Sequence, residues 1–289
     1  MNLSMYTYFS SMIRHEGAET AIAFARAHGF SSVEFLEWMP NERPLTVPDL
    51  HTAQEIRALL EQNGLSTSCF SVGIDLLDPK TGEEIPGSVE ALMRVAEIAA
   101  AVGSPYLHHT LILNISPALH EKNLPFDALL DRLANSARTV AKRANELGLT
   151  VLYEPQGFYI NGIDQFGKFY ARMKAAGVNV GVCGDIGNAL FADVDPTDFF
   201  QAYATEIRHV HLKDYRVETY TPQCKHQSLG KKGLRQVLLG DGDIDLAACI
   251  DSLRAVGYAG AYALEGSYED IEEGFAKELS VARKILQST

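Results

Sequence analysis

The sequence predicts an α/β fold, a single (β/α)8 barrel of the TIM type, and three observations support it. Short apolar runs alternate with longer segments of helical periodicity from one end of the chain to the other. Glycine recurs just past the predicted helix ends, where a left-handed C-cap is needed. Eight strands that are each followed by a helix are seldom found in open doubly wound sheets, whereas a closed barrel requires this number.

The predicted strands are the short apolar runs, several of which end on a polar or charged residue. They lie at residues 3–9, 33–37, 66–72, 106–110, 150–154, 178–185, 207–213 and 261–264. The predicted helices lie between or after them, at residues 19–28, 48–63, 89–102, 126–147, 164–176, 196–203, 245–256 and 269–286. The glycines that follow helices are Gly29, Gly64, Gly103, Gly148, Gly177 and Gly257. Because no linker or low-complexity tract divides the chain, we expect one barrel domain over residues 1–289.

Three connections that follow predicted strands are long. They come after the third, fourth and seventh strands, at residues 73–87, 111–125 and 215–242. In (β/α)8 barrels the loops after the strands converge on one face and carry the chemistry. We therefore expect a small ligand to bind beneath these loops, at the C-terminal ends of the strands.

The composition is typical of a soluble enzyme with an acidic surface. The chain has 289 residues, a formal net charge of −12 and 46% hydrophobic residues. The acidic balance argues against a nucleic-acid partner, which needs a basic surface. The four cysteines are far apart and form no C-x-x-C pair, as is usual in a reducing compartment. With no signal-peptide pattern and no apolar run of about 18 residues, we expect a cytoplasmic protein without a membrane partner.

The predicted strand at residues 207–213 carries two imidazoles and an ammonium group on one face. His209, His211 and Lys213 alternate there with Val210 and Leu212, which would pack on the helices. His211 lies at the strand end, where a metal ion could reach it. His209 lies one layer deeper, and we expect it to be a residue of the barrel interior.

Three other short apolar runs lead into a carboxylate at their C-terminal ends, namely Glu154, Asp185 and Glu265. With His211, all four side chains can point inward at the same level. One neutral imidazole and three carboxylates suit one hard divalent ion, Mn²⁺ above all, then Mg²⁺ or Co²⁺, with Zn²⁺ also compatible. Each residue alone could instead be a helix N-cap or a core histidine. No cluster of lysines and arginines accompanies these carboxylates in the sequence. Three converging carboxylates would then be strongly disfavoured unless a cation binds between them.

Five runs around these positions carry a family resemblance. They are Leu152-Tyr153-Glu154-Pro155, Gly184-Asp185-Ile186-Gly187-Asn188, His209-Val210-His211-Leu212-Lys213-Asp214, Leu239-Gly240-Asp241-Gly242-Asp243-Ile244-Asp245 and Ala263-Leu264-Glu265-Gly266, with Met5-Tyr6-Thr7-Tyr8-Phe9 near the N-terminus. These five runs resemble the xylose isomerase-like barrel superfamily of sugar isomerases and epimerases. The N-terminal run is similar to the first strand of ketose 3-epimerases of the tagatose/psicose type.

The resemblance implies a ligand set and a reaction. Glu154, Asp185, His211 and Glu265 stand where that group has its metal ligands. The two glutamates would serve as the acid/base pair, moving a proton beside a metal-chelated carbonyl through an enediolate. Arg216 stands where the group has a substrate-holding arginine just after strand seven.

The chain departs from the ketose 3-epimerases at two points. Asn188 stands where they have a substrate-contacting histidine, and no second glutamate follows Glu154 closely. These departures leave the ligand set intact and leave the substrate and the reaction open.

Other residues are candidates for the substrate site. His108 and His109 end the fourth strand, and alternation favours His108 as the one that faces the pocket; the alternative is a surface or core histidine. Tyr6, Trp38 and Glu34 could line the sugar site or belong to the core. The full set of predicted substrate-binding residues is Tyr6, Trp38, His108, Asn188 and Arg216.

Three further features allow more than one interpretation. Lys213 could bind a substrate oxygen or neutralise Asp214. The run Gly240-Asp241-Gly242-Asp243 reads as the turn into the next helix, and the basic run at residues 225–232 as a lid or a solvated loop.

The leading hypothesis is a metal-dependent isomerase or epimerase of a small unphosphorylated ketose or polyol ketone, assembled as a homodimer or homotetramer. The alternative is a dehydratase that acts on a keto-inositol or related keto-polyol at the same site. A DNA-repair endonuclease on this barrel would need more histidine and aspartate ligands and a basic groove. A sugar-binding barrel without activity would retain the fold and not need the two glutamates.

Overall fold

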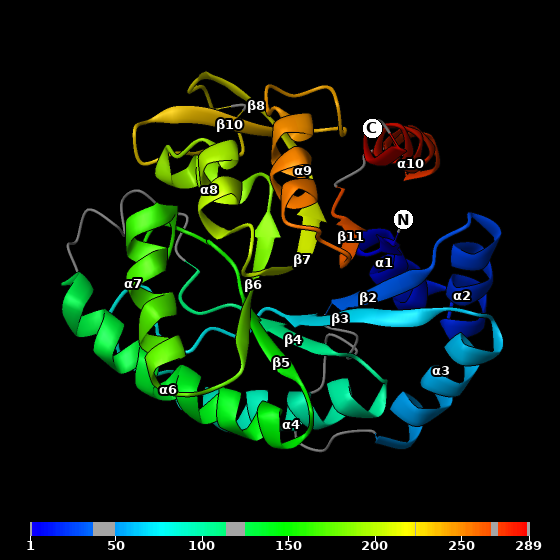
Figure 1. Cartoon of the computed structure of the whole chain (residues 1–289), viewed down its shortest axis with the longest axis horizontal. Coiled ribbons are helices and arrows are strands. Elements are labelled where there is room, and N and C mark those ends of the chain that lie inside the picture. The colour runs from blue at the N-terminus through cyan, green and yellow to red at the C-terminus, as the bar shows by residue number, and fades with distance from the viewer. Residues whose placement is uncertain (1, 37–49, 114–124, 223, 267–270, 288–289) are drawn as a thin grey trace.

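The computed structural model describes residues 2–36, 50–113, 125–222, 224–266 and 271–287. In it, parallel strands form a closed barrel in the order β1-β11-β7-β6-β5-β4-β3-β2. These strands are β1 (Leu3–Met5), β2 (Ser32–Leu36), β3 (Ser66–Val72), β4 (Tyr106–His109), β5 (Thr150–Tyr153), β6 (Val180–Asp185), β7 (Ile207–Leu212) and β11 (Ala261–Leu264). Helices surround the strands (Figure 1). The predicted (β/α)8 barrel is confirmed.

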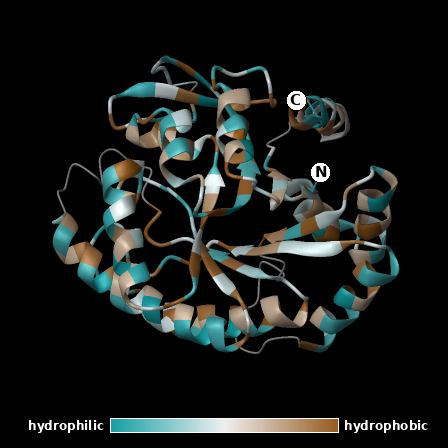
Figure 2. Ribbon diagram, in the orientation of Figure 1, coloured by the Kyte–Doolittle hydropathy of each residue, from teal (hydrophilic) through white to brown (hydrophobic). Residues whose placement is uncertain are grey.

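The helices cover the outside of the barrel with amphipathic faces. They are α1 (Thr7–His15), α2 (Ala18–Ala27), α3 (Leu50–Gln62), α4 (Ser88–Ala101), α6 (Phe126–Glu146), α7 (Gly162–Ala175), the 3-10 helix η1 (Asn188–Ala192), α8 (Pro196–Tyr203), α9 (Leu246–Ala255) and α10 (Ile271–Gln287). In α6, Leu129, Leu133, Ala137 and Val140 recur every three or four residues, and all are buried. Figure 2 shows the result, helices that carry both hydrophilic and hydrophobic segments around the barrel.

The first strand is shorter than the sequence predicts. β1 ends at Met5, and α1 begins at Thr7, so the prediction of a strand through Phe9 is wrong. The physical reason lies further along the chain. Phe9, Met12 and Ile13 are spaced as one face of a helix, and all three are buried.

The connection after β7 holds a small antiparallel sheet that the sequence predicts only as a long loop. Its strands are β8 (Asp214–Thr219), β9 (His226–Gln227) and β10 (Lys232–Val237), in the order β8-β10-β9. The sheet lies beside α8 and α9 in Figure 1. The basic run at residues 225–232 therefore contains β9 and the start of β10.

Hydrogen bonds of the Asp214 carboxylate link this sheet to the turn that precedes α9. Its Oδ2 accepts hydrogen bonds from the backbone N–H groups of Gly240 and Gly242, both at 3.0 Å. A Cβ atom at Gly242 would lie 2.0 Å from Asp214 Oδ1, so only glycine fits there. The run that begins at Gly240 forms the turn into α9, as the sequence predicts.

A register shift between β6 and β7 decides which residues face each other. Val182 pairs with Ile207 but Cys183 pairs with His209, so that Arg208 is an extra, exposed residue of β7. Because of this bulge Asp185 pairs with His211. In an unshifted register Asp185 would pair with Val210, whose side chain points away from the barrel interior.

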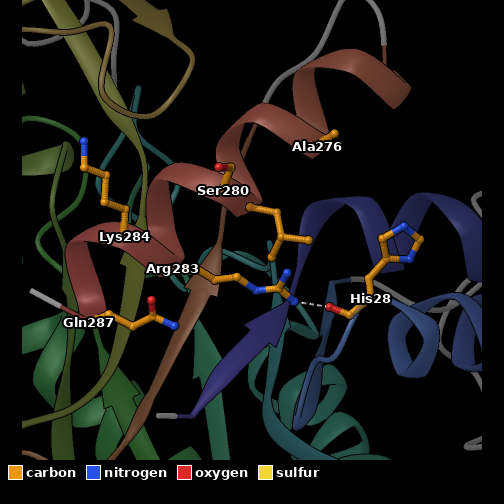
Figure 3. Close-up of a pocket in the computed structure, with 7 residues that line it drawn as sticks. His28, Ala276, Ser280, Arg283, Lys284 and Gln287 are labelled. Carbon is orange, nitrogen blue, oxygen red and sulfur yellow. Dashed lines mark hydrogen bonds between the residues drawn. The ribbon is translucent and has the colours of Figure 1, made fainter.

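The C-terminal helix α10 packs beside α2. Arg283 of α10 donates a hydrogen bond to the carbonyl oxygen of His28, which follows α2 (Figure 3). The ring of Phe275 stacks on Tyr8 at 4.6 Å and lies 5.5 Å from the ring of Phe24. These contacts join α10 to α1 and α2, next to the β1–β11 pair that closes the barrel. None of the helices in the described ranges has an apolar stretch long enough to cross a bilayer.

Candidate metal centre

The structure brings together the four ligands that the sequence predicts. Each of Glu154, Asp185, His211 and Glu265 offers one atom that lies within 4.8 Å of the others. Nδ1 of His211 lies 3.0 Å from Glu154 Oε1, 3.2 Å from Glu265 Oε2 and 3.8 Å from Asp185 Oδ2. These residues, which we call the four-residue cluster, come from the C-terminal ends of β5, β6, β7 and β11.

The cluster is closed on three sides and more open on the fourth. The side chains of Glu154 and His211 are each 2% exposed and that of Asp185 is fully buried, whereas that of Glu265 is 24% exposed. Gln156, just after β5, donates a hydrogen bond to Glu154 Oε2. A substrate would therefore reach the cluster from the side of Glu265.

The orientation of the His211 ring fixes where its lone pair points. Nε2 lies 3.0 Å from Oε1 of Glu34, and a carboxylate can only accept, so Nε2 carries the hydrogen. In the neutral ring the lone pair is then on Nδ1, among the three carboxylates. Burial alone would lower the pKa of His211, but Cys183 and Glu34 hold it well above its ordinary value. The position therefore calls for a positive charge, supplied by a proton or by a metal ion.

Two carboxylate oxygen atoms of the cluster are available as ligands for a cation. Asp185 Oδ1 accepts hydrogen bonds from the backbone N–H groups of Gly187 and Asn188, both at 2.7 Å. Asp185 Oδ2 and Glu265 Oε2 are buried and accept no hydrogen bond within the described part of the chain. Burial raises the pKa of Asp185 well above its ordinary value. Three carboxylates and one imidazole nitrogen are a donor set that fits a divalent ion.

Lys213 balances part of the negative charge. Its Nζ lies 2.7 Å from Asp185 Oδ2, without hydrogen-bond geometry, and 3.0 Å from Glu265 Oε1. The suggestion that Lys213 neutralises Asp214 is wrong, because the Asp214 carboxylate is held by backbone amides instead. With His211 neutral and the three carboxylates ionised, as in a metal-bound state, three carboxylates and one ammonium group leave two negative charges (−3 + 1 = −2), which one divalent ion would neutralise.

A buried polar network surrounds the cluster on its inner side. Glu34 Oε2 lies 2.6 Å from His209 Nε2, and Glu34 Oε1 accepts from Ser71 Oγ at 2.6 Å as well as from His211. Ser71 Oγ in turn lies 3.1 Å from His108 Nδ1. His209 is fully buried, as expected of a residue of the barrel interior. Burial would raise the pKa of Glu34, but His209 and His211 outweigh it and keep that pKa low.

The two histidines that end β4 point in different directions. His108 Nε2 lies 3.5 Å from Glu154 Oε2, so His108 faces the cluster, as alternation predicts. His109 donates from Nδ1 to the carbonyl oxygen of Thr110 at 2.6 Å and packs edge-on against Tyr153, with the ring centroids 5.6 Å apart. Burial lowers the pKa of His109 to about 4.

The other predicted substrate residues lie in different places. The Tyr6 ring stacks on His211 at 4.7 Å, and Asn188 is buried beside Asp185. Arg216 is exposed on β8 and donates to the carbonyl oxygen of Asp241, so the structure does not bring it into contact with the cluster. Trp38 lies outside the described residues.

Tyr215 is a neighbour of the cluster that the sequence analysis did not single out. It is buried, and a Cβ atom at Gly187 would lie 2.6 Å from its ring. Burial raises its pKa to about 12. The signal was present in the sequence, since the alternation of His209, His211 and Lys213 continues to Tyr215.

The fold and the cluster together define a class, the parallel (β/α)8 barrels with a carboxylate-rich candidate metal centre at the strand ends. Within that class, the chain belongs to the xylose isomerase-like TIM barrel family, whose model matches residues 22–285. The family resemblance seen in the sequence is thus confirmed.

Two curated relatives have different named activities. The chain is 25% identical over 163 residues to an inosose dehydratase from Lacticaseibacillus casei, a match to 55% of this chain and 54% of that protein. It is 27% identical over 209 residues to a 2-oxo-tetronate isomerase from Cupriavidus necator, a match to 65% of this chain and 74% of that protein. The chain therefore spans only about half the length of the inosose dehydratase that it matches.

Solved structures share the fold over nearly the whole chain. L-ribulose 3-epimerase aligns with a TM-score of 0.68 at 20% identity, over 97% of this chain and 86% of that chain. The 3-keto-D-glucoside 4-epimerase from E. coli aligns with a TM-score of 0.71 at 16% identity, over 100% of both chains. A xylose isomerase-like protein from Mycobacterium smegmatis, in complex with magnesium, aligns with a TM-score of 0.67 at 17% identity, over 99% of this chain and 97% of that chain.

Proposed function

We propose that the protein is a divalent-metal-dependent isomerase or epimerase of a small keto-sugar or polyol ketone. The observation that carries the proposal is the position of His211 Nδ1, whose lone pair faces three carboxylates at 3.0–3.8 Å while Nε2 is held by Glu34. We expect Mn²⁺ to be the preferred ion, because oxygen-rich sites with one imidazole suit it. The magnesium in the M. smegmatis relative's structure supports a divalent ion in this family.

The chemistry follows from the two glutamates. A bound divalent ion would hold the carbonyl and neighbouring hydroxyl oxygens of the substrate and stabilise the negative charge left by proton removal. Glu154 and Glu265 lie 3.0 and 3.2 Å from the same imidazole nitrogen, and their place at one site supports the proposal that both act on one substrate. One would remove the proton, and the other would return a proton to the opposite face or to the adjacent carbon.

The cluster is suited to an uncharged polyol rather than a phosphorylated one. Among the described residues, the three carboxylates of the cluster outnumber the one ammonium group beside it, and Lys213 already contacts two of them. A divalent ion and Lys213 would together only balance these carboxylates, which leaves no excess positive charge to attract a phosphate. His108, Gln156 and Tyr6 lie next to the cluster and offer polar groups for substrate hydroxyls.

A dehydratase is the second candidate, favoured by the match to inosose dehydratases. Removal of the same proton would be followed by loss of a hydroxyl group from the next carbon. The two reactions share their first step, so the residues of the cluster would keep their roles.

One experiment tests both candidates. The protein is treated with a chelator, then assayed in D₂O with added MnCl₂, MgCl₂ or CoCl₂ against a panel of ketoses, aldoses and an inosose. An isomerase or epimerase gives a product with the substrate's composition and solvent deuterium beside the carbonyl, read by NMR. A dehydratase gives a product lighter by one water, read by mass spectrometry. The control is Glu265→Gln, which should abolish turnover, and activity that survives complete chelation would refute the proposal.

A further inference from the structure

Glu34 has an unusual set of partners for a residue outside the four-residue cluster. It lies on β2, is fully buried, and its two oxygens contact three hydrogen-bonding groups. Oε2 contacts His209 Nε2 at 2.6 Å, while Oε1 contacts Ser71 Oγ at 2.6 Å and His211 Nε2 at 3.0 Å. A carboxylate has no hydrogen to give, so each of these partners must be a donor.

The direction of these bonds determines the tautomers of two histidines. His211 uses its Nε2 hydrogen on Glu34, so the lone pair of the neutral ring is on Nδ1. When no ion is bound, Nδ1 also carries a hydrogen, which it donates to Glu154 Oε1 at 3.0 Å. Ser71 uses its single hydrogen on Glu34, so its oxygen must accept from His108 Nδ1 at 3.1 Å. The neutral His108 ring then has its lone pair on Nε2. That atom lies 3.5 Å from Glu154 Oε2 and has no hydrogen-bond partner among the described residues.

We propose that Glu34 is a positioning residue that sets both tautomers, leaving His211 Nδ1 to bind a divalent ion and, through Ser71, leaving His108 Nε2 to accept a hydrogen bond from a substrate hydroxyl. The inference rests on the proposed function and deepens it. It implies that the substrate carries a hydroxyl group that donates to His108, next to the carbon on which Glu154 acts. A simple ketone without such a hydroxyl would bind poorly.

Replacing Glu34 with glutamine removes the negative charge of the side chain and keeps its size. Glu34→Gln keeps the size of the side chain but offers one acceptor oxygen and an NH₂ group that can only donate. Three donors converge on residue 34, so the amide group must face at least one of them donor to donor. The conflict is relieved if a histidine changes tautomer, and a His211 ring with its hydrogen on Nδ1 cannot bind the ion through that atom.

The test is a calorimetric titration of MnCl₂ into the chelator-treated, full-length protein. Loss of a residue that orients a metal-binding histidine typically weakens metal affinity by about 10–100-fold, which is the change we expect for Glu34→Gln. The matched control is Glu278→Gln on α10, a buried glutamate that accepts from the backbone N–H of Leu239 at 3.0 Å. This variant should bind Mn²⁺ like the wild type.

The tautomer itself is read by ¹⁵N NMR of histidine-labelled protein with MgCl₂, which is diamagnetic. In the wild type the His211 signal should show a hydrogen on Nε2, and this measurement does not require a variant to fold. A hydrogen on Nδ1 in the magnesium-bound wild type, or Mn²⁺ affinity in Glu34→Gln within about threefold of the wild type, would overturn the inference. A wild type that binds no Mn²⁺ would instead overturn the proposed function, so the two failures are distinguishable.

Discussion

Replacing Lys213 with methionine would leave one buried carboxylate, Asp185, and one partly exposed carboxylate, Glu265, without their ammonium partner. Lys213 Nζ lies 2.7 Å from Asp185 Oδ2 and 3.0 Å from Glu265 Oε1, and the Lys213 side chain is 6% exposed. At an effective dielectric constant of about 20, each contact is a Coulomb attraction of roughly 6 kcal/mol before desolvation is subtracted. Because removal of one partner leaves buried charge uncompensated, Lys213→Met should lower the unfolding free energy by about 3–5 kcal/mol in a chelator.

A divalent ion should offset much of this loss. A ligand at 100 times its Kd stabilises the folded state by about 2.7 kcal/mol, and removal of a nearby positive charge should tighten binding of the ion. The stabilisation by MgCl₂ should therefore be larger in Lys213→Met than in the wild type.

Urea unfolding followed by circular dichroism, with EDTA or with MgCl₂, measures both effects. The control is Lys174→Met, whose pair with Glu206 is exposed and should contribute no more than about 1 kcal/mol. The reasoning fails if Lys213→Met unfolds within about 1 kcal/mol of the wild type in EDTA. It also fails if MgCl₂ stabilises the variant less than the wild type.

Binding of Mn²⁺ should release protons, because the pKa of His211 is held well above its ordinary value and the ion must displace that proton. The affinity for Mn²⁺ should therefore rise with pH. Calorimetric titrations in two buffers of different ionisation enthalpy should give different binding heats, and equal heats would count against His211 as a metal ligand. Burial lowers the pKa of His109 from 6.5 to about 4, so between these pH values the unfolded chain binds a proton that the folded chain does not. Stability should fall by about 3 kcal/mol as the pH drops through this window, and His109→Leu should flatten that part of the profile. Gly187→Ala should lower the unfolding free energy by about 1–3 kcal/mol, since its Cβ would lie 2.6 Å from the Tyr215 ring. A thermal unfolding midpoint equal to that of the wild type would contradict this.

The barrel and the four-residue cluster could be predicted because both depend on short-range patterns. Apolar runs, helical periodicity and glycine after helix ends define the elements, and a strand's alternation states which side chains point inward. Asp185 and His211 each lie at the C-terminal end of a strand and point into the barrel. Closure of the barrel is therefore enough to bring the two side chains together. The bulge at Arg208 that aligns them was not visible in the sequence, yet the prediction survived because both residues lie at strand ends.

The contacts that the sequence did not reveal depend on long-range geometry. Glu34 comes from β2 and meets His211 of β7 only because the barrel brings the two side chains to the same depth in its interior. Lys213 has Asp214 as its neighbour in sequence, but its long side chain reaches across to Asp185. The helix α1 was missed because a short apolar run at the N-terminus fits a strand as well as it fits a buried helix.

The central claim is that the four-residue cluster binds one divalent ion, and calorimetry of the chelator-treated protein with MnCl₂ tests it most directly. Asp185 is the fully buried ligand, and Asp185→Asn removes its charge while keeping its size. The wild type should bind one Mn²⁺ per chain, and Asp185→Asn should bind it at least about 10–100-fold more weakly. Wild-type protein that binds no Mn²⁺, or an Asp185→Asn variant that binds it with unchanged affinity, would contradict the account.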